Sequence, residues 1–176
     1  MSTLSLADEL RALAPAPEEV GRVVRVVLRP ARGTRSRMQS AMLTVEGGME
    51  GDRWGLRSHG SKARQLSAIR ADVIDALARG ADPILSGDNL HILLDLSKSN
   101  LPPGTRLHIG AAVVVQLSEE IHAPCALFSG RFGQDAYDIT LAQDFEDQRL
   151  RGVLLSVVVG GRVAEGDEIR ILRGTP

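Results

Sequence analysis

Residues 151–172 read RGVLLSVVVGGRVAEGDEIRIL, and this stretch carries the clearest indication of the fold. The runs VLLSVVV and EIRIL are rich in aliphatic and β-branched residues, which favour strands, and the shorter run RVA lies between them. A glycine pair at 160–161 and the triplet EGD at 165–167 supply turn residues between the runs. The segment therefore predicts three short strands joined by two hairpin-like returns.

Short apolar runs separated by turns extend back through most of the chain. We expect further strands at 22–28, 41–46 and 64–69, and within SGDNLHILL at 86–94 and RLHIGAAVVVQLS at 106–118. Many short strands with few helices favour a β-barrel or a curled sheet, because closure removes exposed strand edges. The predicted fold class is mainly β with minor α.

Two helices are expected beside these strands. An amphipathic pattern at residues 1–13 predicts the first, which the following prolines end. Apolar residues at 73, 74 and 77 share one face of the second, which Gly80 would cap. The chain has no internal repeat and no change of composition along its length. We therefore expect an N-terminal helical extension at 1–20 and one barrel domain at 21–176.

Charge and cysteine content narrow the function classes. The 176 residues carry a formal net charge of −1, which gives no overall attraction to nucleic acid. No run approaches the ~20 apolar residues that span a bilayer, so we expect neither a nucleic-acid nor a membrane partner. Cys125 is the single cysteine, which excludes an intramolecular disulfide and a zinc site built from several cysteines. A reducing, cytoplasmic location is expected.

Cys125 is the first candidate for chemistry. It lies in IHAPCALF, where Pro124 restricts the backbone at the expected end of a strand. Free cysteine often behaves as a small buried hydrophobe, which is one interpretation. The other is functional, since His122 and arginines elsewhere would favour the reactive thiolate form. No known nucleophile signature surrounds the residue, so a Cys-His hydrolase has little support.

Two polar loops supply further candidates. GDRW at 51–54 combines a carboxylate, a guanidinium and an aromatic face. It suits either a polar heterocycle with a phosphate or a charged turn closed by Asp52 and Arg53. SGDNL at 86–90 is either an Asx-type turn or the rim of a pocket. Three histidines lack the spacing of metal ligands: His59, His91 and His108.

Six segments, taken in order, resemble the MOSC family, the molybdenum cofactor sulfurase C-terminal domain, in its small stand-alone bacterial type. They are MEGDRWG, RQLSAI, SGDNL, RLHIGAAVVVQLS, HAPC and RGVLLSVVVGGRVAEGDEI. The matches spread from about Val23 to Leu172, and together they are more specific than any one alone. The resemblance implies a MOSC-like β-barrel with one or two short helices. Its loops would converge on one cysteine at the mouth of a cofactor pocket.

The resemblance also implies a set of site residues. Cys125 matches the family cysteine that carries sulfur or ligates molybdenum. Five further positions match the polar motif positions: Asp52, Arg53, Arg64, Asn89 and Arg151. Gln65, Asp88 and His122 complete the expected cofactor-binding set. Three positions depart from the family pattern: Trp54 stands where His is usual, Asp88 where Glu is usual, and His122 where Arg often precedes the Pro-Cys pair. His122 thus replaces a permanent charge by a titratable one.

The implied function is binding of the molybdenum cofactor (molybdopterin), with Cys125 either carrying sulfur as a persulfide or ligating the metal. Sulfur transfer would need a separate cysteine desulfurase or other sulfur donor and a molybdoenzyme acceptor. Eukaryotic relatives fuse the domain to a desulfurase dependent on pyridoxal phosphate, a cofactor not expected in this chain itself. Two alternatives stay open. They are a molybdenum-dependent reductase of N-hydroxylated compounds, served by a redox partner, and a non-catalytic cofactor-storage module.

The loops at 49–55, 86–90 and 122–129 are expected to meet at one end of the barrel, although they are far apart in sequence. Each carries polar or reactive residues just outside a predicted strand, and sites are usually assembled from loops on a rigid scaffold. Convergence would bring the thiol within reach of a ligand bound by the other loops. Arg53 and Arg151 would then contribute to an anion pocket.

Overall fold

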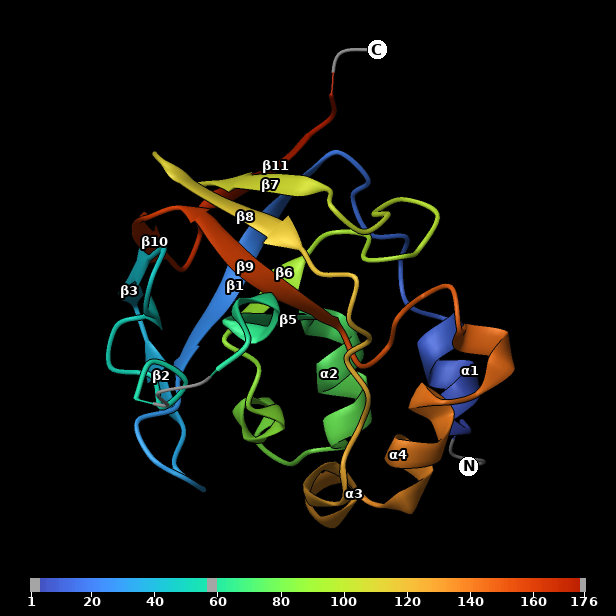
Figure 1. Ribbon diagram of the computed structural model, residues 1–176. Helices are drawn as coiled ribbons and strands as arrows, with labels where there is room; N and C mark the ends of the chain where they lie inside the picture. The colour runs from blue at the N-terminus through green and yellow to red at the C-terminus, as the bar shows by residue number, and fades with distance from the viewer. Residues whose placement is uncertain (1–3, 57–59, 175–176) are drawn as a thin grey trace.

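Seven strands close into a barrel in the computed structural model, which describes residues 4–56 and 60–174. The order around the ring is β1-β11-β7-β8-β9-β5-β6 and back to β1 (Figure 1). The mainly β barrel predicted from the sequence is thereby confirmed. The strand bounds are β1 Val20–Leu28, β5 Leu66–Arg70, β6 Leu90–Leu93, β7 Arg106–Ile109, β8 Val113–Leu117, β9 Val153–Val159 and β11 Glu168–Leu172.

Strand β1 closes the barrel because it is long enough to pair with three strands. Its first residues pair with β11, and the stretch from Arg22 to Val26 pairs with β6 across a register shift. Its last residues pair with β2, Ser36–Met38, which lies outside the ring. The pair β5 and β6 is parallel, so the chain between them must cross over, and helix α2 (Ala71–Ala78) makes that connection.

The C-terminal segment forms the three predicted strands but not the predicted hairpins. Strand β9 pairs with β5 and β8, whereas β11 pairs with β7 and β1. Between them, β10 (Gly161–Ala164) leaves the barrel and joins β3 (Ser40–Thr44) and β4 (Gly48–Met49) in a second sheet. Strand and turn residues are local properties, whereas barrel closure decides the partners. The expectation of hairpin-like returns was therefore wrong.

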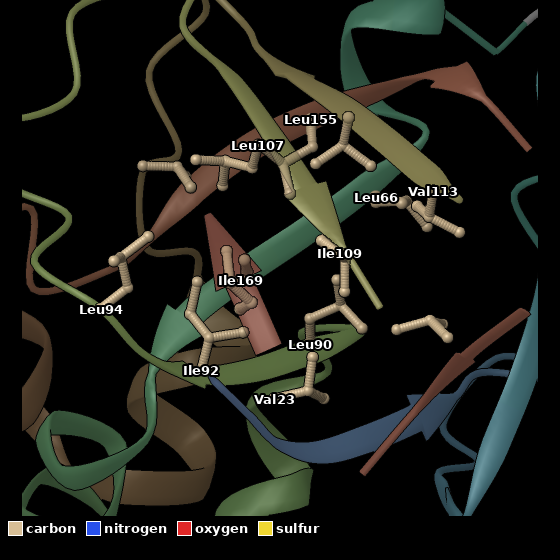
Figure 2. Packing of buried hydrophobic residues seen from close by; sticks show 14 of the residues in the cluster. Val23, Leu66, Leu90, Ile92, Leu94, Leu107, Ile109, Val113, Leu155 and Ile169 are labelled. Carbon is tan, nitrogen blue, oxygen red and sulfur yellow. The ribbon is translucent and has the colours of Figure 1, made fainter. Parts of the chain in front are cut away.

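Aliphatic side chains from the barrel strands fill its interior (Figure 2). On β8, Val113, Val115 and Leu117 are buried while the residues between them are half-buried, which is the period of a strand with one inward face. Figure 2 shows Val23 of β1 and Ile169 of β11 in the same cluster. This core fixes the relative positions of the loops at the barrel ends.

Four short α-helices lie on the outside of the barrel, where one or two were expected (Figure 1). A second apolar cluster joins them to Ile69 of β5. Because α2 covers its outer face, β5 is buried along four consecutive residues and shows no alternation of buried and exposed residues. The remaining bounds are α1 Leu6–Arg11, α3 Ala126–Phe132, α4 Gln134–Thr140, and the 3-10 helices η1 Lys62–Arg64, η2 Pro83–Ser86 and η3 Gln143–Phe145.

The sequence pattern indicates α3 and α4 only weakly, because each is seven residues long and depends on packing more than on helix propensity. The N-terminal helix α1 is shorter than the helix predicted at 1–13. Residues 1–3 lie outside the described part of the chain. Helix α2 ends at Ala78, and its C-cap is Arg79, which adopts the left-handed conformation (φ 47°), whereas Gly80 was the predicted cap. None of the helices in the described part of the chain has the length and apolar character of a membrane span.

Candidate functional site

A pocket of about 880 Å³ opens beside Cys125. Its walls are formed by Arg29, which follows β1, by the stretches 53–56 and 121–125, and by the stretch between Gly60 and Ser67. The segment that carries Cys125 runs from β8 down to α3 (Figure 1). The loops at 49–55 and 122–129 therefore meet, as predicted. His59 lies outside the described residues.

Asp52 is buried and forms an ion pair with Arg29, which lines the pocket. Arg29 donates through Nε and Nη2 to the two carboxylate oxygens of Asp52, at 2.8 Å each. The backbone N–H groups of Arg29 and Trp54 donate to the same carboxylate. Burial opposes ionisation, but the contacts from Arg29 outweigh it, so the pKa of Asp52 lies below its usual value. Asp52 thus pairs with Arg29, whereas the charged-turn interpretation paired it with Arg53, which lines the pocket.

Asn89 and Gln65 are fully buried and act as cross-links between segments. The Asn89 amide donates to Asp52 Oδ2 at 3.0 Å, and its oxygen accepts from the Ser67 backbone N–H at 3.2 Å. Gln65 donates to the Val45 carbonyl and accepts from a β9 backbone N–H. The loop at 86–90 therefore contacts the loop at 49–55 through Asp52, and its Asp88 lies near His122 of the third loop. The matched positions Asn89 and Gln65 hold the walls of the pocket and do not line it.

Asp88 and Arg151 form a buried ion pair behind His122. Asp88 is fully buried, and Arg151 Nη1 lies 3.0 and 2.7 Å from its two oxygens. Burial raises the pKa of Asp88, but the charge of Arg151 outweighs this effect and the pKa is lowered. Arg151 also lies over the Phe128 ring, 4.9 Å from its centroid. Arg151 lines a neighbouring cavity of about 410 Å³ and is not among the residues that line the cysteine pocket. Its contribution to anion binding stays a prediction.

His122 separates these two cavities and lines both. Its Nδ1 is 3.6 Å from Asp88 Oδ1 and has no hydrogen-bond partner among the described residues. Burial, followed by the charge of Arg151, lowers the pKa of His122 to about 4, although Asp88 opposes the shift. His122 is therefore neutral at pH 7. It does not supply the cationic neighbour that the sequence suggested for Cys125.

Cys125 is exposed, so the interpretation as a buried hydrophobe is excluded. It precedes α3, and its carbonyl accepts from the Phe128 backbone N–H at 2.8 Å. Phe128 and Phe132 are buried in the second apolar cluster and pack edge to face. The docking of α3 against the helices therefore sets the place of the thiol at the pocket.

The pocket has a basic lining. Of its described lining residues, Arg29, Arg53 and Arg64 are basic and none is acidic. Arg64 forms an ion pair with exposed Glu120 at the rim. Trp54 forms one wall, and a Cβ at Gly60 would lie 2.8 Å from its ring. The arrangement suits an anionic ligand with a flat ring, placed beside a thiol.

Arg29 lines the pocket but was not predicted as a site residue, although its position in the sequence could have indicated it. Arg29 directly follows the last residue of β1, and polar residues just outside a strand were the criterion for the other loops. The described residues contain no cluster of three or more His, Cys, Asp or Glu side chains able to hold a metal ion.

Solved structures share this architecture. The YuaD protein from Bacillus subtilis is similar at a TM-score of 0.65 and 17% identity, over 89% of this chain and 97% of that one. YiiM from Escherichia coli is similar at a TM-score of 0.59 and 21% identity, over 88% and 71% of the two chains. YiiM from Geobacillus stearothermophilus gives 0.60 and 14%, over 87% and 75%. At these identities the likeness establishes the fold alone.

Comparison at the sequence level identifies the family. No curated protein sequence gives a significant match. The sequence model of the MOSC domain matches residues 55–170, which is more than half of the chain. The match runs from the Trp54 side of the pocket through Cys125 to β11. With the closed barrel and the cysteine pocket, this match shows that the chain belongs to the MOSC domain family.

Proposed function

We propose that this chain binds the molybdenum cofactor in the cysteine pocket, with Cys125 as its functional group. The MOSC family is associated with that cofactor. The observation that carries the proposal is the exposed Cys125 thiol at a pocket lined by Arg29, Arg53 and Arg64. A volume of about 880 Å³ lies within the ~300–1,000 Å³ range of small-molecule sites.

The residues of the pocket fit the chemical parts of such a cofactor. Arg53 and Arg64 are suited to the anionic parts of the cofactor, because guanidinium groups bind phosphate and other oxyanions through paired donors. The Trp54 ring is suited to the face of a pterin. The unpartnered Nδ1 of His122 is a further polar atom beside the pocket. When bound, the cofactor would supply a molybdenum centre with its own sulfur ligands, which the described protein residues do not provide.

Two roles for Cys125 share this pocket. As a sulfur carrier, its thiolate attacks the terminal sulfur of a persulfide on a separate donor protein, such as a cysteine desulfurase. The donor's S–S bond breaks, the donor leaves as a thiolate, and Cys125 becomes the persulfide. Delivery to a molybdoenzyme's cofactor then needs an external two-electron reductant, which cleaves the S–S bond at Cys125, releases the outer sulfur as sulfide and returns Cys125 to the thiolate. As a metal ligand, Cys125 holds the molybdenum directly. Exposure of the thiol supports either role, because a protein donor and a bound ligand both need access.

A reductase of N-hydroxylated compounds is a second candidate at the same pocket. The cavity of about 410 Å³ that shares His122 and Leu154 with the cysteine pocket favours it, because a substrate would have its own compartment. Such a reaction would need an external redox partner. Multiple turnovers with an added electron donor support reduction, whereas a stable Cys125 persulfide supports sulfur transfer.

The test is expression in a cofactor-producing host, followed by measurement of molybdenum and of oxidised-pterin fluorescence in the purified chain. We expect both to accompany the wild-type protein and to fall in Arg53→Gln, because that change removes a positive charge from the lining of the pocket. Arg162→Gln is the matched control, since Arg162 is exposed on β10, away from the pocket. A wild-type chain without molybdenum and without pterin would contradict the proposal.

Cys125→Ala separates the two roles of the thiol. If Cys125 ligates the metal, the variant should lose molybdenum together with the wild-type X-ray absorption signature of the metal. If it carries sulfur, the variant should keep the cofactor and lose the persulfide that mass spectrometry detects after incubation with a sulfur donor. A variant that keeps the cofactor, with no persulfide formed in the wild type, would make the thiol a spectator.

A further inference from the structure

A group of arginines surrounds the turn Leu85–Gly87, next to the cysteine pocket. Arg35, from the loop after β1, lies against Gly87, where an added Cβ would be 2.8 Å from its Nε and Nη2. Arg29 Nη1 donates to the Gly87 carbonyl at 3.3 Å. Arg131 of α3 donates through Nη1 to the Leu85 carbonyl at 2.8 Å. Three guanidinium groups from separate segments therefore meet at one turn.

The positive charge at this turn is largely unneutralised. Of the three arginines, Arg29 has a carboxylate partner, Asp52. Within the described ranges, no Asp or Glu oxygen lies within ion-pair distance of Arg35 or Arg131. Burial, and then the charges of Arg131, Arg53 and Arg29, lower the pKa of Arg35 to about 10, although the charge of Asp52 opposes the shift, so Arg35 stays charged at pH 7.

One donor in the cluster also lacks an acceptor. Arg35 Nη1 donates to the Thr34 carbonyl at 2.8 Å, but Arg35 Nε is buried and has no hydrogen-bond partner among the described residues. Buried polar groups are normally paired, and a buried unpaired donor on a charged group is especially costly. Like charges held together around an unused donor are the arrangement that an anion would neutralise.

The turn itself leaves room for the cluster. Gly87 has φ +77°, a conformation that favours glycine, and it has no side chain to displace Arg35. The Arg35 guanidinium can therefore lie against the turn, with its Nε and Nη2 beside the Gly87 backbone. Tetrahedral phosphate oxygens match such forked donors on more than one side.

We propose that Arg35 and Arg131 form an anion subsite beside Gly87 and that this subsite takes a phosphate group. The subsite is separate from the lining of the cysteine pocket but joins it through Arg29. Two sources present the same chemistry, the phosphate of a cofactor in the neighbouring pocket and free inorganic phosphate. The first source rests on the proposed function, and the second does not.

Inorganic phosphate is the probe, titrated into the cofactor-free chain by calorimetry at fixed ionic strength. Arg35→Gln and Arg131→Gln should each weaken binding about tenfold or more, because each removes charge-assisted hydrogen bonds. Arg32→Gln is the matched control, since Arg32 is exposed in the same loop and changes the net charge equally. Gly87→Ala should also weaken binding without any change of charge, because its Cβ meets the Arg35 guanidinium.

Repeating the titration on the cofactor-loaded chain distinguishes the sources. Loss of phosphate binding on loading means that the subsite takes the cofactor's phosphate. Unchanged binding means that it takes a separate phosphate. Both results support the subsite, and so does phosphate binding by a chain that never binds cofactor, even though the proposed function then fails. The inference is overturned if phosphate does not bind the wild type, or if Arg35→Gln and Arg131→Gln bind it no more weakly than Arg32→Gln.

Discussion

Asp52→Asn should be strongly destabilising, because it removes the charge that compensates a buried arginine. The Asp52 side chain is 1% exposed and that of Arg29 is 14% exposed, and two 2.8 Å hydrogen bonds join them. The asparagine has nearly the same shape, so the change isolates the charge and leaves no cavity. Breaking a buried ion pair by removing one partner costs about 3–5 kcal/mol.

The matched control is Glu165→Gln, which breaks a bidentate pair at the surface. Arg37 donates to both Glu165 oxygens, at 2.7 and 3.1 Å, but the Arg37 side chain is 55% exposed. An exposed pair of this kind contributes about 0–1 kcal/mol. The two substitutions make the same chemical change, so the difference between them measures the effect of burial.

The assay is urea unfolding followed by circular dichroism, at pH 7 and again at acid pH. The folded state lowers the pKa of Asp52, so its contribution is fully present above the unfolded value of about 3.9 and is lost as pH falls through the folded value. The deficit of Asp52→Asn should therefore be largest at pH 7 and shrink at acid pH. An Asp52→Asn deficit at pH 7 no larger than that of Glu165→Gln would refute the assignment of Asp52 as the anchor of Arg29.

Three further predictions concern the scaffold. Gly152→Ala should lower the free energy of unfolding by about 3 kcal/mol or more, because the new Cβ would lie 2.1 Å from a β5 carbonyl oxygen and Gly152 has φ +86°. The control is Gly166→Ala, which has a similar φ of +89° but open space around the Cβ, and it should cost about 1 kcal/mol. Equal costs would contradict the close approach of β5 and β9. Phe128→Ala should lower the free energy of unfolding by about 3–5 kcal/mol, because Phe128 is buried in the second apolar cluster. It should also slow the alkylation of Cys125 or cofactor loading beyond what the stability loss explains, since α3 would be less firmly packed. Wild-type stability of the variant would contradict the role of Phe128 in anchoring α3. Burial in the folded state lowers the pKa of His91 and His122 from 6.5 to about 4, so the free energy of unfolding should fall as the pH drops from 6.5 to 4. His122→Asn should make this pH dependence shallower in thermal unfolding. An unchanged slope would contradict the burial of His122 as a neutral side chain.

The sequence predicted the elements of this fold better than their partners. The runs at 153–159, 162–164 and 168–172 became β9, β10 and β11, because strand and turn residues act locally. Their pairing with β3, β5 and β7 depends on segments roughly a hundred residues away or on barrel closure, which no local pattern encodes. Helices α3 and α4 were missed for the same reason, since tertiary packing stabilises them.

The candidate site shows the same contrast between what the local sequence encodes and what tertiary packing decides. The sequence brought together the correct loops and placed Cys125 at a pocket with Arg53 and Arg64. It could not assign roles within them, because burial decides whether a polar side chain binds a ligand or supports a neighbour. Asp88 is such a support, and burial also makes His122 neutral, which no sequence pattern states.

The most direct test of the account is protection of Cys125 from alkylation by bound cofactor. Iodoacetamide should modify Cys125 in the native, cofactor-free chain, because the residue is exposed. Mass spectrometry follows the rate in the cofactor-free and the cofactor-loaded protein at pH 7, with unfolded protein as the reference for full access. The account predicts that loading slows alkylation at least tenfold, since the thiol and the cofactor share one pocket. An equal rate in the loaded and the cofactor-free protein would contradict it.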